Sequence, residues 1–306
     1  MDQFERQRLR EQRRHGDAMF PLHVYRMEQA PGETVVDCHW HEEAEFLIVT
    51  RGGALFQIDT SYVEVTAGEA VFVHGGEVHA GHALGTEGCD FWAIVFDWNL
   101  IGGGMLDAVQ RRFIAPLAEH RLTLPRHWKG EGDWERAVLD CLHQIVGAFQ
   151  GRREGFELLV KAQLLLILHE VAAAEKWSAR RPVSPQDAAK VERLKAVLTR
   201  VQTDYRGRIR TRDLADAAHM SEGQFCRFFK SMTRKTPVEY MNAYRVNQAA
   251  LLLRQNDWKV SDVALEVGFD NFSYFIKVFR SQYGCTPSEY RRGISREAAG
   301  GTAGEL

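Results

Sequence analysis

Hydrophobic and polar positions follow a strand-like pattern over residues 20–104. The runs EFLIVT, ALFQID, YVEV, AVFV and FWAIVF are short and apolar, and glycine pairs or polar turns separate them. Several short strands at this spacing are typical of a β-sandwich or β-barrel. We therefore expect a β-barrel here, preceded by a charged arm over residues 1–19.

The pattern takes a helical period over residues 105–177. The stretch DWERAVLDCLHQIVGAFQ places its apolar residues on one face and begins at Asp133, the expected N-cap. The segment 156–174 is apolar on more than one side, which predicts burial against the other helix, the barrel or a second subunit. We expect a helical pair that connects and dimerises the chain, followed by a linker over 178–189 that is rich in proline and serine.

Residues 190–296 contain a repeat of about fifty residues. The copy that starts at Asp213 aligns with the copy that starts at Asp262. Aligned pairs include Ala215 with Ala264, Phe225 with Phe275, Phe229 with Phe279, and Tyr240 with Tyr290. Each copy has the pattern helix, short turn, helix, which is that of a helix–turn–helix unit. The fold class is therefore α+β: a barrel with a helical pair, then an all-α domain whose two units are joined by a connecting helix, with a flexible tail over 297–306.

Local signals position the second helix of each unit. Ser221 has capping-box spacing to the glutamine three residues later, and Asp270 or Asn271 can cap the corresponding helix of the second unit. Gly268 is expected to form the second turn, and His219 stands at the equivalent position of the first. The residues expected to face DNA are Glu222, Gly223, Cys226, Arg227 and Lys230, and Asn271, Phe272, Ser273, Ile276, Lys277 and Arg280.

The charge distribution, the cysteine content and the length of the apolar runs indicate which kinds of partner and which compartment to expect. Residues 186–296 carry 20 Lys and Arg against 12 Asp and Glu, whereas the whole chain has a net charge of −2. A basic third on an acidic body indicates a polyanionic partner. Five scattered cysteines favour a reducing cytoplasm over a disulfide framework. No apolar run reaches the length of a membrane span, so we expect no membrane partner.

The segment VALEVGFDNFSYFIKVFRSQYGCTPSEYRR resembles the signature of the AraC/XylS family of bacterial transcriptional regulators. The resemblance covers residues 190–294 and includes the connecting helix YMNAYRVNQAALLLRQN. It implies a cytoplasmic regulator, typically an activator, that binds double-stranded promoter DNA as a homodimer and works with RNA polymerase. The sequence departs from the family at Gly223, where a large base-contacting residue often stands, which puts base reading by the first unit in question.

The stretch HWHEEAEF at 39–46 carries candidate metal ligands. Alternate residues of a strand share a face, so His39, His41 and Glu45 are expected to point into the barrel together. Region 20–104 resembles the cupin barrel that many of these regulators use to sense an effector. The cupin motifs read Gly32, His39, His41, Glu45 and Gly52, then Gly68, Gly76 and His79, with His74 in place of the usual proline.

Three interpretations of this pocket remain open. His39, His41, Glu45 and His79 can bind Zn, Mn, Fe or Ni as three nitrogens and one oxygen. They can instead bind a small metabolite such as a sugar without any metal, so no cofactor is required, or they can be structural polar residues. Trp40 and Trp92 can stack on a sugar face or belong to the core.

Three functions follow from these features. The leading hypothesis is a ligand-responsive transcriptional regulator that is not an enzyme. The alternative is a metal-dependent cupin enzyme, such as a dioxygenase or isomerase, with an accessory DNA-binding domain. The third is a constitutive DNA-binding protein whose barrel only dimerises. Metal analysis separates the enzyme from the others, and effector-dependent DNA binding separates the first from the third.

Overall fold

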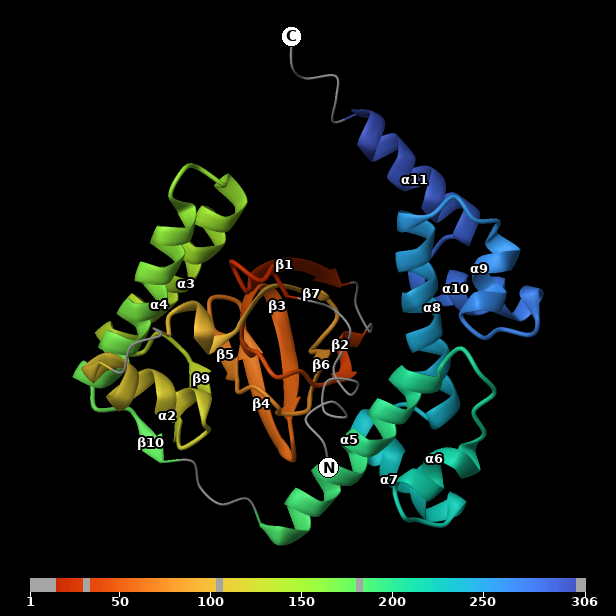
Figure 1. Cartoon of the computed structure of the whole chain (residues 1–306), viewed down its shortest axis with the longest axis horizontal. Coiled ribbons are helices and arrows are strands. Elements are labelled where there is room, and N and C mark those ends of the chain that lie inside the picture. The colour runs from red at the N-terminus through yellow and green to blue at the C-terminus, as the bar shows by residue number, and fades with distance from the viewer. Residues whose placement is uncertain (1–14, 30–33, 103–106, 180–183, 301–306) are drawn as a thin grey trace. The chain divides into compact units, whose positions relative to one another are not determined.

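The computed structural model describes residues 15–29, 34–102, 107–179 and 184–300, with side chains up to residue 293. Most of the predicted charged arm, Gly32 of the first cupin motif and the end of the predicted tail lie outside these residues. The chain divides after Val191 into two compact units (Figure 1).

The first unit is built on antiparallel strands. They are β1 (Leu22–Gln29), β2 (Thr34–His39), β3 (Ala44–Ile58), β4 (Ser61–Thr66), β5 (Ala70–Val73), β6 (His79–Ala83), β7 (Cys89–Phe96), β8 (Leu122–Thr123), β9 (His127–Trp128) and β10 (Ser178–Ala179). The order in one layer is β1-β7-β3-β5-β9, while β4 and β6 pair with β3 and β2 pairs with β6. The small β8–β10 ladder lies apart from this sheet. The prediction of a β-rich cupin-like domain is confirmed.

Strand β3 belongs to both layers of the barrel. Its first half pairs with β5 and β7, and its second half pairs with β4 and β6. The sequence predicted two separate runs around the glycine pair at 52–53, but the structure has one bent strand. The bend falls at a register shift after Val49. Gly52 has a φ of 70°, and a Cβ there would lie 2.0 Å from the carbonyl oxygen of Gly88. Only glycine therefore fits where β3 passes the backbone that precedes β7.

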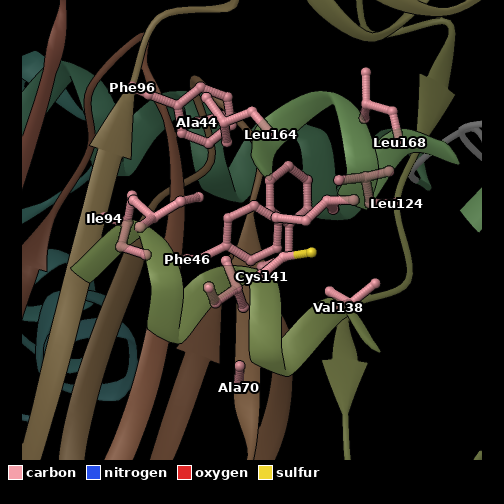
Figure 2. Close-up of a cluster of buried hydrophobic side chains, with 14 of the residues drawn as sticks. Ala44, Phe46, Ala70, Ile94, Phe96, Leu124, Val138, Cys141, Leu164 and Leu168 are labelled. Atoms are coloured by element: carbon pink, nitrogen blue, oxygen red, sulfur yellow. The ribbon is translucent and has the colours of Figure 1, made fainter. Parts of the chain in front are cut away.

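The two faces of β3 pack into different cores. Leu47 and Val49 point into the barrel, where they join Phe56 and Phe91. Phe46 and its alternating neighbours point outward and are covered by helices, as Figure 2 shows. The covering helices are α3 (Asp133–Gly151) and α4 (Phe156–Ala173), which contact the sheet through residues such as Val138, Cys141, Leu164 and Leu168. The side-chain alternation of strands therefore separates a barrel interior from a helix-covered outer face.

The region between the barrel and α3 is less helical than predicted. It contains the 3₁₀ turn η1 (Trp98–Leu100), the π-helical turn η2 (Gln110–Ile114), α2 (Ala115–Ala118), and strands β8 and β9. Asp133 is the first residue of α3 rather than its cap, and Gly132 takes the cap position. Periodicity could not find these short strands, because each has two residues.

The second unit is all helical and begins within α5. Its helices are α5 (Pro185–Asp204), α6 (Thr211–Ala217), α7 (Glu222–Thr233), α8 (Pro237–Gln255), α9 (Val260–Glu266), α10 (Phe272–Tyr283) and α11 (Pro287–Gly300). The pairs α6–α7 and α9–α10 form the two helix–turn–helix units, and α8 connects them. Because α5 starts at Pro185 and α11 ends at Gly300, the predicted linker and tail each include residues that are helical.

The two predicted turns have the backbone that the repeat requires. His219 has a φ of 54° and Gly268 a φ of 89°, so both units turn through a left-handed residue. A Cβ on Gly268 would lie 2.5 Å from the carbonyl oxygen of Tyr205. Arg245 of α8, which is buried, holds the segment after α5 at this place. Its Nε donates to the Tyr205 oxygen at 2.7 Å and its Nη2 to the Gly207 oxygen at 2.7 Å.

We expect opposite effects from matched substitutions at the two turns. Gly268→Ala should lower the free energy of unfolding by about 1–3 kcal/mol, because it combines a left-handed φ with a clash against backbone. His219→Gly should leave it unchanged or raise it by up to about 1 kcal/mol, since it relieves the same φ without a new contact. Urea denaturation of the full chain, followed by circular dichroism of its helices, measures both. A Gly268→Ala variant as stable as the original chain would show that this turn relaxes without cost.

Candidate ligand pocket and nucleic-acid interface

Three histidines of the barrel are held in the same way. Each ring has its Nδ1 within hydrogen-bond distance of a backbone carbonyl oxygen two residues away in the sequence. The contacts are His39 with Asp37 at 2.7 Å, His41 with Glu43 at 3.1 Å, and His79 with Glu77 at 3.0 Å. A carbonyl oxygen only accepts, so Nδ1 carries the proton and Nε2 becomes the ligand atom of the neutral ring. Histidines that bind metals are commonly oriented by such a contact on the other nitrogen.

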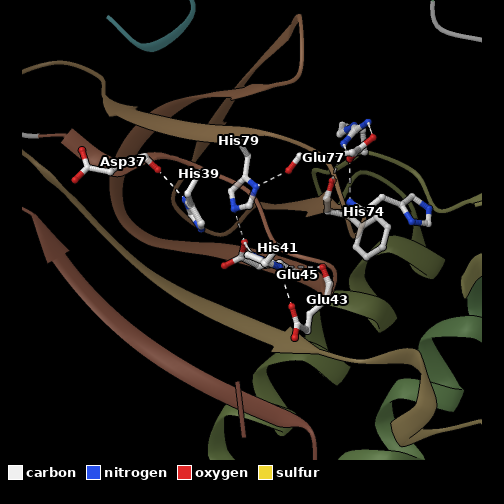
Figure 3. Close-up of polar contacts among 10 residues, drawn as sticks. Asp37, His39, His41, Glu43, Glu45, His74, Glu77 and His79 are labelled. Atoms are coloured by element: carbon white, nitrogen blue, oxygen red, sulfur yellow. Dashed lines mark hydrogen bonds and ion pairs between the residues drawn. The ribbon is translucent and has the colours of Figure 1, made fainter. Parts of the chain in front are cut away.

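These rings converge with Glu45 (Figure 3). The Nε2 of His79 lies 3.0 Å from Glu45 Oε2, and the Nε2 of His41 lies 3.5 Å from the same oxygen. The ring centroids of His39 and His79 are 4.2 Å apart. One ligand atom from each of His39, His41 and His79 falls within 4.8 Å of the others. The four residues that the two motifs nominated are therefore brought together by the fold.

Glu45 is the electrostatic centre of this side-chain cluster. It is 5% exposed, and this burial alone raises the pKa of the carboxyl group. Hydrogen bonds and charge interactions with His41 and His79 outweigh burial and hold the pKa well below its usual value. Both nitrogens of His79 thus face acceptors, the Glu77 carbonyl and the Glu45 carboxylate. Either a second ring proton or a metal cation on Nε2 satisfies that arrangement.

The positioning of His41 differs from the sequence prediction. Strand β2 ends at His39 and β3 begins at Ala44, so His41 lies in the turn between them and strand alternation does not orient it. The turn that carries the second motif holds it instead. The backbone N–H of Gly76 donates to the His41 carbonyl oxygen at 2.6 Å. A Cβ on Gly75 would lie 2.0 Å from the carbonyl oxygen of Glu42, so the two turns meet backbone to backbone.

The two tryptophans have different positions. Trp40 is half-buried in the turn beside His41. Trp92 pairs with Ile48 on β3, on the outward face that packs beneath α3 and α4, with the Arg26 guanidinium 5.7 Å from its ring centroid. Glu45 points to the other face, so the structure contradicts the assignment of Trp92 to the pocket. Successive side chains of a strand point to opposite faces, so Trp92, which lies opposite Ile48, points away from the Glu45 side.

Two residues near the pocket were missed by the motifs. Glu43 places its Oε2 3.6 Å from Nδ1 of His41. His15 lies with its ring centroid 5.1 Å from that of His41 and its Nδ1 3.1 Å from the Tyr25 hydroxyl. Glu43 could have been suspected from its place inside HWHEEAEF. No local signal indicates His15, because it precedes β1 and reaches the pocket only through the tertiary fold.

The second helices of the two helix–turn–helix units have the same burial pattern. Phe225 and Phe229 in α7, and Phe275 and Phe279 in α10, are fully buried. Among the residues expected to face DNA, those that are exposed are Glu222, Gly223, Arg227, Lys230, Asn271, Phe272, Ser273, Lys277 and Arg280. Cys226 and Ile276 are half-buried at equivalent positions. The two units therefore present the same pattern of exposed positions.

Two details of α10 change the expected interface. Asn271 caps the helix, because its Oδ1 accepts from the backbone N–H of Tyr274 at 2.9 Å. Asn271, rather than Asp270, therefore makes the predicted cap, and its amide oxygen is already engaged. Tyr274, which the sequence analysis did not select, is 45% exposed beside Phe272 at 43%. Its hydroxyl accepts from Asn242 of α8 at 2.9 Å, so this ring is held in place on the exposed face.

Comparison with known proteins matches both units. A cupin domain profile matches residues 25–95, and a helix-turn-helix domain profile matches residues 214–293. The uncharacterized HTH-type transcriptional regulator YdeC of Bacillus subtilis strain 168 is 26% identical over 94% of this chain and 97% of its own. The HTH-type transcriptional activator RhaR of Pectobacterium carotovorum is 26% identical over 85% and 87%.

Comparison with solved structures gives a more distant match. ToxT from Vibrio cholerae O395 has 16% sequence identity over 91% of this chain and 99% of its own, with a TM-score of 0.45.

In the described residues, every helix is too short or too polar to span a membrane. Both relatives are named as transcriptional regulators, which favours the regulator hypothesis over the alternative of a metal-dependent cupin enzyme. The chain therefore combines a cupin domain with a C-terminal helix-turn-helix domain, and it is similar over most of its length to HTH-type transcriptional regulators.

Proposed function

We propose that the chain is a cytoplasmic, homodimeric activator whose cupin pocket binds a small effector and thereby controls binding to promoter DNA. The observation that carries this proposal is the convergence of three oriented imidazoles on the buried Glu45 carboxylate. Buried polar side chains gathered on one side of an apolar barrel are more typical of a binding site than of a hydrophobic core. The name of the relative RhaR, a transcriptional activator, supports activation over repression, and hence RNA polymerase as a partner.

The pocket residues fit a divalent transition-metal cation. His39, His41, His79 and Glu45 supply three nitrogens and one oxygen, a set suited to Zn, Mn, Fe or Ni. The carbonyl contacts on the three Nδ1 atoms orient the rings for this role. A bound cation would supply a Lewis-acid position for a hydroxyl or carboxylate oxygen of the effector.

Removing two ligands should separate sensing from DNA binding. We expect chelator-treated protein to gain up to about 2.7 kcal/mol of stability when Zn²⁺ or Mn²⁺ is added at a hundredfold excess over Kd. The double variant His41→Ala with His79→Ala should lose this gain, and its salt-dependent binding to duplex DNA should stay intact because the second unit is separate. Thermal denaturation and fluorescence anisotropy measure the two properties. Stabilisation by polyols or sugars but not by either metal would favour metal-free effector binding in the same pocket.

We assign base reading and phosphate binding to different residues of α7. Arg227 lies in the first half of this helix, opposite the buried Phe225 and Phe229, where a guanidinium can bond O6 and N7 of a guanine. Lys230 lies nearly one turn further toward the C-terminal end, where the helix leaves the groove. Its ammonium is therefore assigned to a phosphate.

Alanine substitutions at these two residues should be distinguishable. Arg227→Ala should lower affinity for a selected operator by about 1–3 kcal/mol more than for scrambled duplex. Lys230→Ala should lower both affinities about equally and reduce the slope of log affinity against log salt by about one unit. Titrations at several salt concentrations test this. Equal losses on both duplexes for Arg227→Ala would make it a phosphate contact and leave sequence reading to α10, around Ser273 and Lys277.

We assign the dimer contact to the outer face of α4. Its inner face packs on α3 and the sheet, yet leucines also occupy the outer face at helical spacing. Those leucines are Leu158, Leu159, Leu165 and Leu166, which are 74%, 43%, 41% and 44% exposed. Four leucines on one exposed helix face are typical of a helix that packs against a second copy.

Charging this face should dissociate the dimer. The double variant Leu158→Lys with Leu165→Lys should weaken association at least about 100-fold, since each buried leucine contributes about 1.5–3 kcal/mol. Val109→Lys is the matched control, because Val109 is also 44% exposed but lies outside α4. Sedimentation equilibrium measures both variants. An unchanged dimer in the double variant would place the contact elsewhere.

A further inference from the structure

We propose that His15, His41 and Glu43 form a second position for a divalent transition-metal cation, beside the four-ligand position and in competition with it for His41. One ligand atom from each of these three residues lies within 4.8 Å of the others, and His15 and His41 are buried. Neither His15 nor Glu43 belongs to the cupin motif residues. The inference rests on the proposed pocket only through the His41 ring.

The two nitrogens of His41 face two different carboxylates. Its Nε2 lies 3.5 Å from Glu45 Oε2, and its Nδ1 lies 3.6 Å from Glu43 Oε2. The two nitrogens point away from each other across the five-membered ring. A cation beside Glu43 therefore occupies a different place from one beside Glu45.

His15 is held in place by a tight turn. Gly16 has a φ of 82°, and a Cβ there would lie 2.3 Å from the carbonyl oxygen of Phe20. The Oδ1 of Asp17 accepts from the backbone N–H groups of Met19 and Phe20, each at 2.8 Å. His15 is 8% exposed and its Nδ1 faces the Tyr25 hydroxyl, so we assign Nε2 as its ligand atom.

The donor set selects the class of cation. Two imidazole nitrogens and one carboxylate oxygen suit Zn²⁺, Co²⁺ or Ni²⁺ better than Ca²⁺ or Mg²⁺, which prefer oxygen ligands. Metal–ligand bonds of about 2.0–2.1 Å in a tetrahedral site separate the ligand atoms by about 3.4 Å. The ligand atoms of the three side chains, all within 4.8 Å of one another, lie close to that separation.

Sharing His41 makes the two positions compete through its tautomer. A neutral imidazole has one lone pair, which is on Nε2 while Nδ1–H donates to the Glu43 carbonyl. Binding at the second position requires that lone pair on Nδ1. The ring proton then moves to Nε2, where it donates to Glu45, and no net proton is taken up or released. Each cation therefore weakens the binding of the other.

Zinc titration of the full chain tests this proposal. Chelator-treated protein, titrated in competition with a chromophoric chelator, should show two classes of site, with the second equivalent bound more weakly. His15→Ala and Glu43→Gln should each leave only the first class. The double variant His39→Ala with His79→Ala should leave one class, and adding His15→Ala should abolish it. His23→Gln is the matched control, because this histidine lies 4.4 Å from the Tyr25 ring, between centroids, but belongs to neither ligand group.

Two results would overturn the second position. One is a His15→Ala titration that matches that of the original chain. The other is a His39→Ala/His79→Ala variant that binds no zinc, or binds it equally with and without His15, while near-ultraviolet circular dichroism shows a native fold. Loss of the first class alone in the double variant contradicts neither proposal, so the two sites are judged independently.

Discussion

The buried carboxylate of Glu45 is the constraint on which the first unit depends. An ionised group inside an apolar barrel costs several kcal/mol unless partners compensate its charge. His41 and His79 supply that compensation, and each must be oriented by a backbone carbonyl to do so. Two turns are therefore fixed against each other: the one that carries His41, and the one that carries Gly75 and Gly76.

The pocket and the helical pair are two faces of the same strands. Glu45 points into the barrel, whereas its neighbour Phe46 packs beneath α3 and α4. If ligand binding at Glu45 displaces β3, the Phe46 side chain moves with the strand. The helices packed on Phe46 must then adjust, because close-packed interiors transmit small shifts. On the proposed function, this is the physical connection between the effector and the outer leucines of α4.

The two helix–turn–helix units bury the same pattern of phenylalanines but differ in how tightly their turns are packed. Phe225 and Phe229 repeat as Phe275 and Phe279, and the exposed positions repeat with them. The turn of the second unit packs tightly against the Tyr205–Gly207 segment, which the buried Arg245 holds by two hydrogen bonds. Only glycine fits there. The corresponding turn of the first unit accepts His219 with a positive φ.

The sequence by itself indicated the β-rich and helical regions, the repeat and the turns at His219 and Gly268, and it singled out His39, His41, Glu45 and His79, which the fold brings together. These depend on local spacing: strand alternation, capping residues and motif intervals. Only the tertiary structure decided what depends on contacts between distant segments. It joined two predicted strands into β3 through the crossing at Gly52, and it placed Trp92 on the outer face. It also brought His15 close to His41. The turn that carries His15 precedes the first strand, and no local pattern specifies that it lies beside the turn that carries His41.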